Sequence, residues 1–252
     1  KRRASIQHPG EVVFLSLLPG GESLLSVCRA GKLRVWSLES QECLSCQAGY
    51  EDGATVSCAA LTPGKKHLVT GSVDGRLKLW PLDALPSVPA SPTSQLSVPI
   101  KEPLLSIAAH SASTLVLRDS SSVARICHFP ADGDPEVIKL SGHDGLVTCV
   151  WLYEDGTGDF LVTGSKDDTL KVWSLSDGSC VNTLKGHSSW ISDVTVLATD
   201  KGPQVLSACN DKTVKMWLPT KGEVTKRDRH ELSALCIALA GSAPDSLVGI
   251  SG

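Results

Sequence analysis

The hydrophobic positions of this chain fall in short runs that are separated by turns rich in glycine, proline and serine. The run 11–18 stops at a Pro-Gly-Gly turn, and the run 54–61 stops at Thr-Pro-Gly. Short apolar runs bounded by such residues predict β-strands. No apolar run reaches the roughly 20 residues that a membrane-spanning helix needs. The pattern therefore predicts an all-β protein with no membrane partner.

One stretch of the chain recurs at a nearly constant interval. Residues 163–173 have the pattern of a strand, a tight turn and a second strand that ends at a tryptophan. Related stretches occupy residues 26–36, 70–80 and 207–217. Trp36 and Trp80 are 44 residues apart, and so are Trp173 and Trp217. Phe129 takes the equivalent place 44 residues before the tryptophan of 163–173. This period indicates one repeated structural unit instead of a mosaic of domains.

Each repeat carries two further apolar runs, one before and one after the paired strands. The later run is seen at 43–46, 137–140 and 180–184. We therefore predict four strands per repeat. The predicted repeats span residues 8–49, 50–100, 101–141, 142–185 and 186–229, and an incomplete sixth spans 230–252.

Two places depart from this pattern. Residues 81–93 are rich in proline and serine, which predicts a solvated loop. The third repeat has no tryptophan and no aligned aspartate, so we expect it to be the least regular. Its paired strands are predicted at Thr114–Leu117 and Val123–His128, joined by Asp119–Ser122.

These residues resemble the WD-repeat family, whose repeats hold a Gly-His dipeptide, a strand, a turn and a hydroxyl-x-x-x-Asp segment leading to tryptophan. The resemblance is strongest in 142–184 and 186–229. The aspartate that follows the tryptophan in that family is absent here. The resemblance implies an all-β propeller with one four-stranded blade per repeat. We expect five blades and a truncated sixth of a seven-bladed or larger propeller, in a parent protein that continues past Gly252.

Two repeats carry a set of side chains that looks like a hydrolase triad. The sets are His143, Thr163, Asp167 and Trp173, and His187, Ser207, Asp211 and Trp217. Because the whole set is copied with the repeat, whereas an active site normally occurs once, we predict no catalytic residues. The resemblance implies that each set is a buried hydrogen-bonded network that joins the loop before a blade to its inner strands. His8 and His230 occupy related positions, and Ala30 replaces the aspartate of the first repeat.

Composition adds information about the environment and the ligands. The net charge of −3 arises from 24 basic and 27 acidic residues spread along the chain, which gives no reason to expect nucleic acid as the main partner. The nine cysteines cannot all pair internally, and most stand in apolar runs. We interpret them as reduced core residues of a cytoplasmic or nuclear protein.

The pair Cys43 and Cys46 has the spacing of metal ligands, but no second pair or nearby histidine accompanies it. A structural zinc site needs four ligands, so we interpret the pair as outer-strand residues. The sequence also lacks a phosphate-binding glycine loop, a His-Glu-x-x-His motif and a Gly-x-Ser-x-Gly motif. We therefore predict no cofactor, no metal and no small-molecule substrate.

If the Gly-His loop and the hydroxyl-x-x-x-Asp turn meet, the variable residues beside them line one face. This candidate binding face comprises Arg29, Val73, Asp144, Lys166, Ser188, Trp190 and Asn210. Its mixed chemistry favours a protein or peptide ligand over nucleic acid. Trp190 has two open interpretations, as packing filler or as an exposed contact residue, and Trp151 is expected to be buried between blades.

The resulting hypothesis is a non-enzymatic scaffold or adaptor that mediates protein–protein interactions within a larger intracellular protein. One alternative is a sensor or autoinhibitory propeller that packs on its own chain in a regulatory or assembly protein. A second alternative is an RNA-associated propeller of a ribonucleoprotein complex, although the sequence shows no basic surface.

Overall fold

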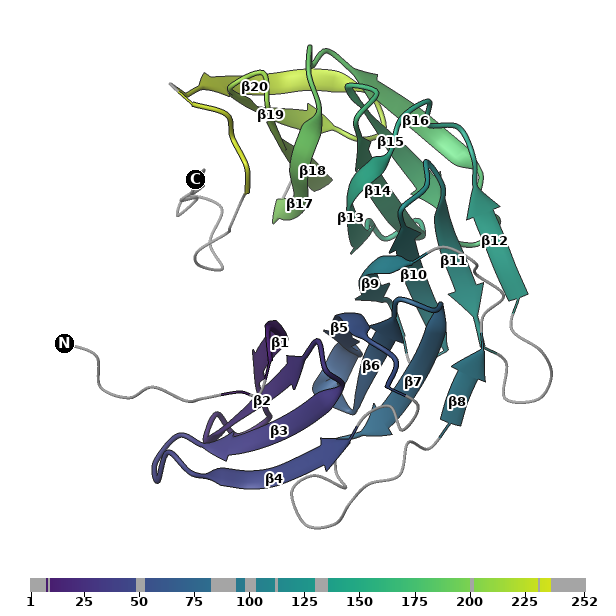
Figure 1. The fold of residues 1–252 in the computed structure, drawn as a ribbon. Helices are drawn as coiled ribbons and strands as arrows, with labels where there is room; N and C mark the ends of the chain where they lie inside the picture. The colour runs from purple at the N-terminus through teal and green to yellow at the C-terminus, as the bar shows by residue number, and fades with distance from the viewer. Residues whose placement is uncertain are drawn as a thin grey trace. The chain divides into compact units, whose positions relative to one another are not determined.

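The computed structural model (Figure 1) describes residues 8, 10–48, 53–82, 94–97, 103–111, 113–129, 136–199, 202–230 and 232–236. Twenty strands in this part of the chain form five four-stranded antiparallel sheets. The strand order follows the chain within every sheet. This confirms the predicted all-β class and the predicted four strands per repeat. The part of the sixth repeat that follows residue 236 lies outside the described residues.

The strands of the first three sheets have the following bounds. The first sheet contains β1 (Val12–Leu17), β2 (Ser23–Cys28), β3 (Lys32–Ser37) and β4 (Cys43–Ala48). The second contains β5 (Val56–Leu61), β6 (His67–Ser72), β7 (Arg76–Pro81) and β8 (Ser94–Ser97), with a short 3-10 turn, η1 (Pro63–Lys65), between β5 and β6. The third contains β9 (Leu104–Ala109), β10 (Thr114–Asp119), β11 (Ala124–His128) and β12 (Glu136–Leu140). The third repeat therefore keeps all four strands without a tryptophan.

The last two sheets contain the two complete copies of the repeated side-chain set. The fourth sheet contains β13 (Val147–Glu154), β14 (Asp159–Ser165), β15 (Thr169–Ser174) and β16 (Cys180–Lys185). The fifth contains β17 (Ile191–Thr199), β18 (Gly202–Cys209), β19 (Thr213–Leu218) and β20 (Glu223–Arg229).

The register of the strands has an irregularity that recurs at the tryptophan. Between the third and fourth strands of a sheet, the pairing shifts at Trp36, at Trp173 and at Trp217. The fourth strand therefore has one extra residue opposite this point, which is a β-bulge. The pairing of the first two strands shifts as well, for example between Val147 and Cys149.

The hydrophobic core lies between neighbouring sheets. The chain divides into two compact units, residues 1–119 with 127–136, and residues 120–126 with 137–252. In the first unit, Leu25 and Val35 of the first sheet share a buried cluster with Trp80 of the second. In the second unit, Val172 of the fourth sheet shares a cluster with Trp217 of the fifth.

The packing in the second unit leaves no room for a side chain at Gly164 in β14. A β-carbon built there would lie 2.6 Å from both Cys149 Sγ and Ile191 Cγ2. Because β-carbon contacts this short do not occur, glycine is the residue that lets β17 approach β14 so closely.

The structure corrects two expectations about side chains. Trp151, expected to be buried, is 44% exposed, whereas Val147 on the same strand β13 is buried, so the packing on the faces of the sheet covers only part of this strand. No disulfide joins any of the nine cysteines, and four of them are exposed instead of in the core: Cys43, Cys46, Cys180 and Cys236. Within the described residues, no helix has the length or the hydropathy to cross a membrane.

Candidate functional site

In the first, second, fourth and fifth sheets, the loop before the sheet lies against the turn that joins the second and third strands. In four of the sheets, a backbone N–H of this inner turn donates to a carbonyl of the incoming loop over 2.8–3.0 Å. The donors are Arg29, Val73, Lys166 and Asn210, and their respective acceptors are Glu11, Thr55, Leu146 and Trp190. The backbone thus brings together the two segments from which the candidate binding face was predicted.

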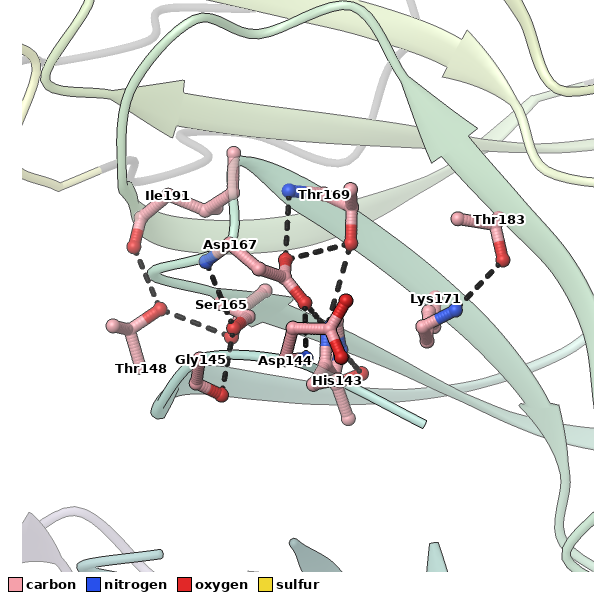
Figure 2. A network of polar contacts seen from close by, with 12 residues as sticks. His143, Asp144, Gly145, Thr148, Ser165, Asp167, Thr169, Lys171, Thr183 and Ile191 are labelled. Carbon is pink, nitrogen blue, oxygen red and sulfur yellow. Dashed lines mark hydrogen bonds and ion pairs between the residues drawn. The ribbon is translucent and has the colours of Figure 1, made fainter. Parts of the chain in front are cut away.

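In the fourth sheet, four side chains connect these segments, and Figure 2 shows two of them, His143 and Asp167. Trp173 Nε1 donates to Thr163 Oγ1 over 2.8 Å, and Thr163 Oγ1 lies 2.7 Å from His143 Nε2. His143 Nδ1 lies 2.7 Å from Asp167 Oδ2. Because a carboxylate only accepts, the imidazole proton is on Nδ1, and Nε2 accepts the hydroxyl proton of Thr163. The network therefore runs in one direction, from indole to carboxylate.

Asp167 also orders the inner turn itself. Its Oδ1 accepts the backbone N–H of Thr169 over 3.0 Å and the Thr169 hydroxyl over 2.7 Å. Its Oδ2 accepts the backbone N–H of Asp144 over 3.0 Å. Between these partners Asp168 has φ of 67°, in the left-handed region that a non-glycine residue seldom adopts. The carboxylate thus fastens both the incoming loop and a strained turn.

The fifth sheet repeats this geometry with serine in place of threonine. Trp217 Nε1 donates to Ser207 Oγ over 2.8 Å, and His187 Nε2 lies 2.7 Å from the same oxygen. His187 Nδ1 lies 2.8 Å from Asp211 Oδ2. The ammonium of Lys215 stands 3.9 Å from that carboxylate and donates to the backbone carbonyl of Gly186.

Burial and hydrogen bonds together determine the protonation states of the histidines and aspartates in these sets. Burial lowers the pKa of His143 and of His187, although the neighbouring carboxylates partly oppose this shift. For Asp167 and Asp211, burial alone would raise the pKa, but hydrogen bonds from threonine and histidine outweigh it and the pKa is lowered. At neutral pH each pair is therefore a neutral imidazole with a carboxylate. Both imidazole rings are fully buried, so no substrate reaches them.

One group of residues has the composition of a metal site. Ligand atoms of His187, Cys209 and Asp211 lie within 4.8 Å of one another. However, Cys209 Sγ donates to the backbone carbonyl of Ser189 over 3.0 Å, and burial raises the pKa of its thiol to about 12. A metal ion needs the thiolate, and the imidazole and carboxylate already bind each other. We interpret this group as part of the hydrogen-bonded network.

The first sheet contains an incomplete copy of the network. Trp36 Nε1 donates to Ser26 Oγ over 2.8 Å, and the ring centroid of His8 lies 6.4 Å from that of Trp36. With Ala30 in place of the aspartate, neither ring nitrogen of His8 has a hydrogen-bond partner among the residues that the structure describes. The imidazole is thus present without the acceptor that orients it in the fourth and fifth sheets.

The second sheet keeps the aspartate without the histidine. Trp80 Nε1 donates to Thr70 Oγ1 over 3.0 Å. Asp74 instead pairs with Arg76 Nε at 2.9 Å and accepts a hydrogen bond from the Ser72 hydroxyl. In the sixth repeat, the backbone N–H of His230 donates to the carbonyl of Lys212 over 2.8 Å.

In the second unit, most of the predicted binding-face residues are exposed. Lys166 Nζ lies 4.1 Å from the ring centroid of Trp190, and 49% of Trp190 is exposed, so Trp190 is a surface residue. Leu146, which is 41% exposed, was not predicted, although it stands 44 residues before Trp190 at the same repeat position. Asp144 and Ser188 are also exposed, whereas Asn210 is half-buried.

In the first unit, the two predicted residues have different surroundings. Arg29 is exposed and pairs with Glu11 at 2.7 Å, an acidic partner that was not predicted. Val73 is 40% exposed. The sequence could have indicated Glu11 as part of this face, because Glu11 stands at the end of the loop before the first sheet.

The chain is similar in sequence to proteins with a known repeat. Residues 41–81, 135–174 and 178–217 match the family described as WD domain, G-beta repeat. Nuclear distribution protein PAC1 of Coccidioides posadasii (strain C735) is 27% identical over 201 residues, which cover 75% of this chain and 41% of that protein. Apoptotic protease-activating factor 1 of Danio rerio is 26% identical over 253 residues, which cover 84% of this chain and 19% of that protein. The chain thus spans less than half the length of these relatives.

A solved structure shows the same fold. The crystal structure of the WD40 beta propeller domain of Doa1 matches with a TM-score of 0.68 at 20% sequence identity. The match covers 92% of this chain and 74% of that chain. The five sheets are therefore blades of a β-propeller.

Proposed function

Because this chain belongs to the WD40 repeat family, we propose that it is a non-catalytic scaffold that binds protein partners within a larger intracellular protein. The proposal gives the binding role to the exposed residues of the incoming loops and inner turns. Propeller folds support many unrelated functions, so the argument has to come from these side chains.

The main support is the exposed pair of Lys166 and Trp190 in the second unit. A lysine 4.1 Å from an indole ring centroid makes a cation–π contact, which keeps the large aromatic surface in one orientation. Leu146 adds an exposed apolar side chain, and its backbone carbonyl binds the N–H of Lys166. Tryptophan is the residue most enriched at the centres of protein interfaces, so an ordered and exposed indole favours a protein ligand.

The charges near this pair favour a peptide with mixed character. Ser188 is exposed and stands two residues before Trp190. Asp144 is exposed and stands two residues before Leu146, whose carbonyl accepts a hydrogen bond from the N–H of Lys166. Their backbone N–H groups are bound by Asp167 and Asp211, so the loops are held before any partner arrives. A preorganised loop loses less conformational entropy on binding.

The same networks argue against an enzyme. The two imidazoles are fully buried, their protons are assigned to fixed partners, and the set occurs twice. A general base has to reach the proton that it removes. The lack of disulfides among the nine cysteines supports a reducing compartment, in the cytoplasm or the nucleus.

The experiment is affinity capture from cell lysate with identification of the captured proteins by mass spectrometry. The wild type is compared with a variant carrying Lys166→Glu, Trp190→Ala and Asn210→Arg. A matched control carries Trp151→Ala and Lys226→Glu, which change an equally exposed tryptophan and an exposed lysine elsewhere. Circular dichroism first establishes that both variants are folded.

We expect a discrete set of proteins that is captured by the wild type and the control and lost in the face variant. Loss of the same proteins after RNase treatment would instead indicate tethering through RNA. Equal capture by all three proteins would refute the assignment of the face. Capture of nothing by the wild type would favour a contact within the parent chain, and would refute the scaffold role in trans.

A further inference from the structure

The edge strand β4 carries two exposed thiols, those of Cys43 and Cys46. Figure 1 shows β4 as the last strand of the first sheet, where only β3 pairs with it. In a regular strand, residues three apart point to opposite faces. The alternation would therefore place these two thiols on different sides of the sheet.

The β-bulge in β4 changes this result. Cys46 pairs with Arg34, Ser45 with Val35, and Cys43 with Trp36, so the strand has an extra residue between the last two pairs. Arg34 and Trp36 are two residues apart and share one face of β3. Their partners across the ladder lie on the same face, so Cys43 and Cys46 share it too.

The fourth blade shows how close two side chains come at these positions. Cys180 pairs with Trp173 and Thr183 pairs with Lys171, which is the same register with the same shift. There Cys180 Sγ lies 3.9 Å from Thr183 Oγ1.

The first thiol has the same orientation in both blades. Cys43 Sγ donates to the backbone carbonyl two residues later over 3.2 Å, and Cys180 Sγ does so over 3.4 Å. The side chain of Cys46 starts from the position that Thr183 occupies in the fourth blade. The second thiol of β4 is therefore within about 4 Å of the first when it adopts the rotamer of the threonine hydroxyl.

This separation matches the sulfur atoms of a bidentate metal complex. Metal–thiolate bonds near 2.3 Å hold two sulfurs on one ion at most about 4.6 Å apart. Zinc requires four ligands, whereas the soft ion Cu(I) binds thiolates with fewer ligands, and a separation of about 4 Å places two of them on one ion in a bent arrangement. We propose that Cys43 and Cys46 form a two-thiolate binding site for a soft monovalent cation such as Cu(I).

The charges of the site favour such a complex. Two thiols and one Cu(I) give a bis-thiolate complex of charge −1 and two released protons, with no change in oxidation state. Arg34, opposite Cys46 in the ladder, supplies a cation on the same face of the sheet. The site lies on the outer strand, whereas the proposed protein-binding residues lie at the incoming loops, so it is independent of the scaffold role.

The test is an anaerobic titration of the fully reduced protein with Cu(I) held by the chromophoric competitor bicinchoninate. The wild type is expected to withdraw one equivalent of Cu(I) from the competitor. Cys43→Ser and Cys46→Ser should each lose that equivalent, since one thiolate cannot chelate. Cys180→Ser, which removes an equally exposed single thiol, should retain it. Because β4 is an exposed edge strand and serine is close in size to cysteine, circular dichroism should be unchanged in all three.

The fourth blade offers an independent gain-of-binding test. In a Cys43→Ser background, Thr183→Cys should restore one equivalent, because it recreates the thiol pair beside Lys171. Failure of this variant to bind would overturn the geometric argument. Cu(I) binding that persists in Cys43→Ser and Cys46→Ser, or that falls equally in Cys180→Ser, would show adventitious binding to scattered thiols and would overturn the proposal.

Discussion

Asp211 is the residue whose removal tests the hydrogen-bonded network most directly. Its carboxylate is 6% exposed, and it accepts hydrogen bonds from His187 Nδ1 at 2.8 Å and from the N–H of Thr213 at 2.9 Å. Asp211→Ala removes these acceptors while the donors stay buried. A third buried donor, the Thr213 hydroxyl, loses its acceptor as well.

The cost follows from the donors that are left without partners. Each buried polar group that is stranded costs about 1–3 kcal/mol. The substitution also removes the charged partner of Lys215, whose buried ammonium lies 3.9 Å from the carboxylate, and breaking a buried ion pair typically costs about 3–5 kcal/mol. Water can reach the backbone N–H of the exposed Ser188, so that bond contributes little. We therefore expect Asp211→Ala to lower the free energy of unfolding by about 3–5 kcal/mol.

A matched control exists in the second blade. Asp74 occupies the same repeat position, but its side chain is 38% exposed and pairs with the exposed Arg76. Surface ion pairs contribute about 0–1 kcal/mol, so Asp74→Ala should cost no more than that. The comparison keeps the substitution and the repeat position constant, whereas the burial of the carboxylate and its bonded partners differ.

The assay is urea unfolding at 25 °C, followed by tryptophan fluorescence and far-ultraviolet circular dichroism. Coincidence of the two curves establishes that a single transition is being compared, which a repeat protein does not guarantee. The free-energy difference follows from the shift in midpoint at unchanged slope. Equal midpoints for the Asp211→Ala and Asp74→Ala variants would refute the argument that burial of the network stabilises the blade.

Three further outcomes follow from burial. Trp173→Ala should lower the free energy of unfolding by about 3–5 kcal/mol, because this side chain is buried. Trp151 is half-exposed, so Trp151→Ala should lower it by less than half as much. Equal urea midpoints for the two variants would contradict this. Gly164→Ala should lower the thermal midpoint because its β-carbon would meet Cys149 Sγ at 2.6 Å, whereas Gly158→Ala, with nothing closer than 3.7 Å, should not. Because burial lowers the pKa of the two network histidines, the unfolded state binds more protons below about pH 6.5, so the urea midpoint should fall from there toward pH 5. A urea midpoint that does not depend on pH would contradict that assignment. So would a pH dependence of the midpoint that stays the same when either histidine is replaced by glutamine.

Much of the candidate site was predictable because its residues are copied with the period. His143 and His187, and Asp167 and Asp211, are 44 residues apart, so their positions relative to the strands follow from the repeat alone. The contact between Lys166 and Trp190 was not predictable. These residues belong to different blades, and their distance depends on how the blades pack against each other.

The sequence by itself determined the strand class, the four strands of each repeat and the membership of the repeated polar sets. Each of these depends on local alternation and on a constant spacing, which are properties of the chain. The tertiary structure alone decided which tryptophans are exposed, and it decided that Cys43 and Cys46 share a face. Exposure depends on which side chains of strands and loops are covered when neighbouring elements pack. The shared face depends on a bulge, which is a property of the pairing between two strands, and the periodicity of one strand cannot reveal it.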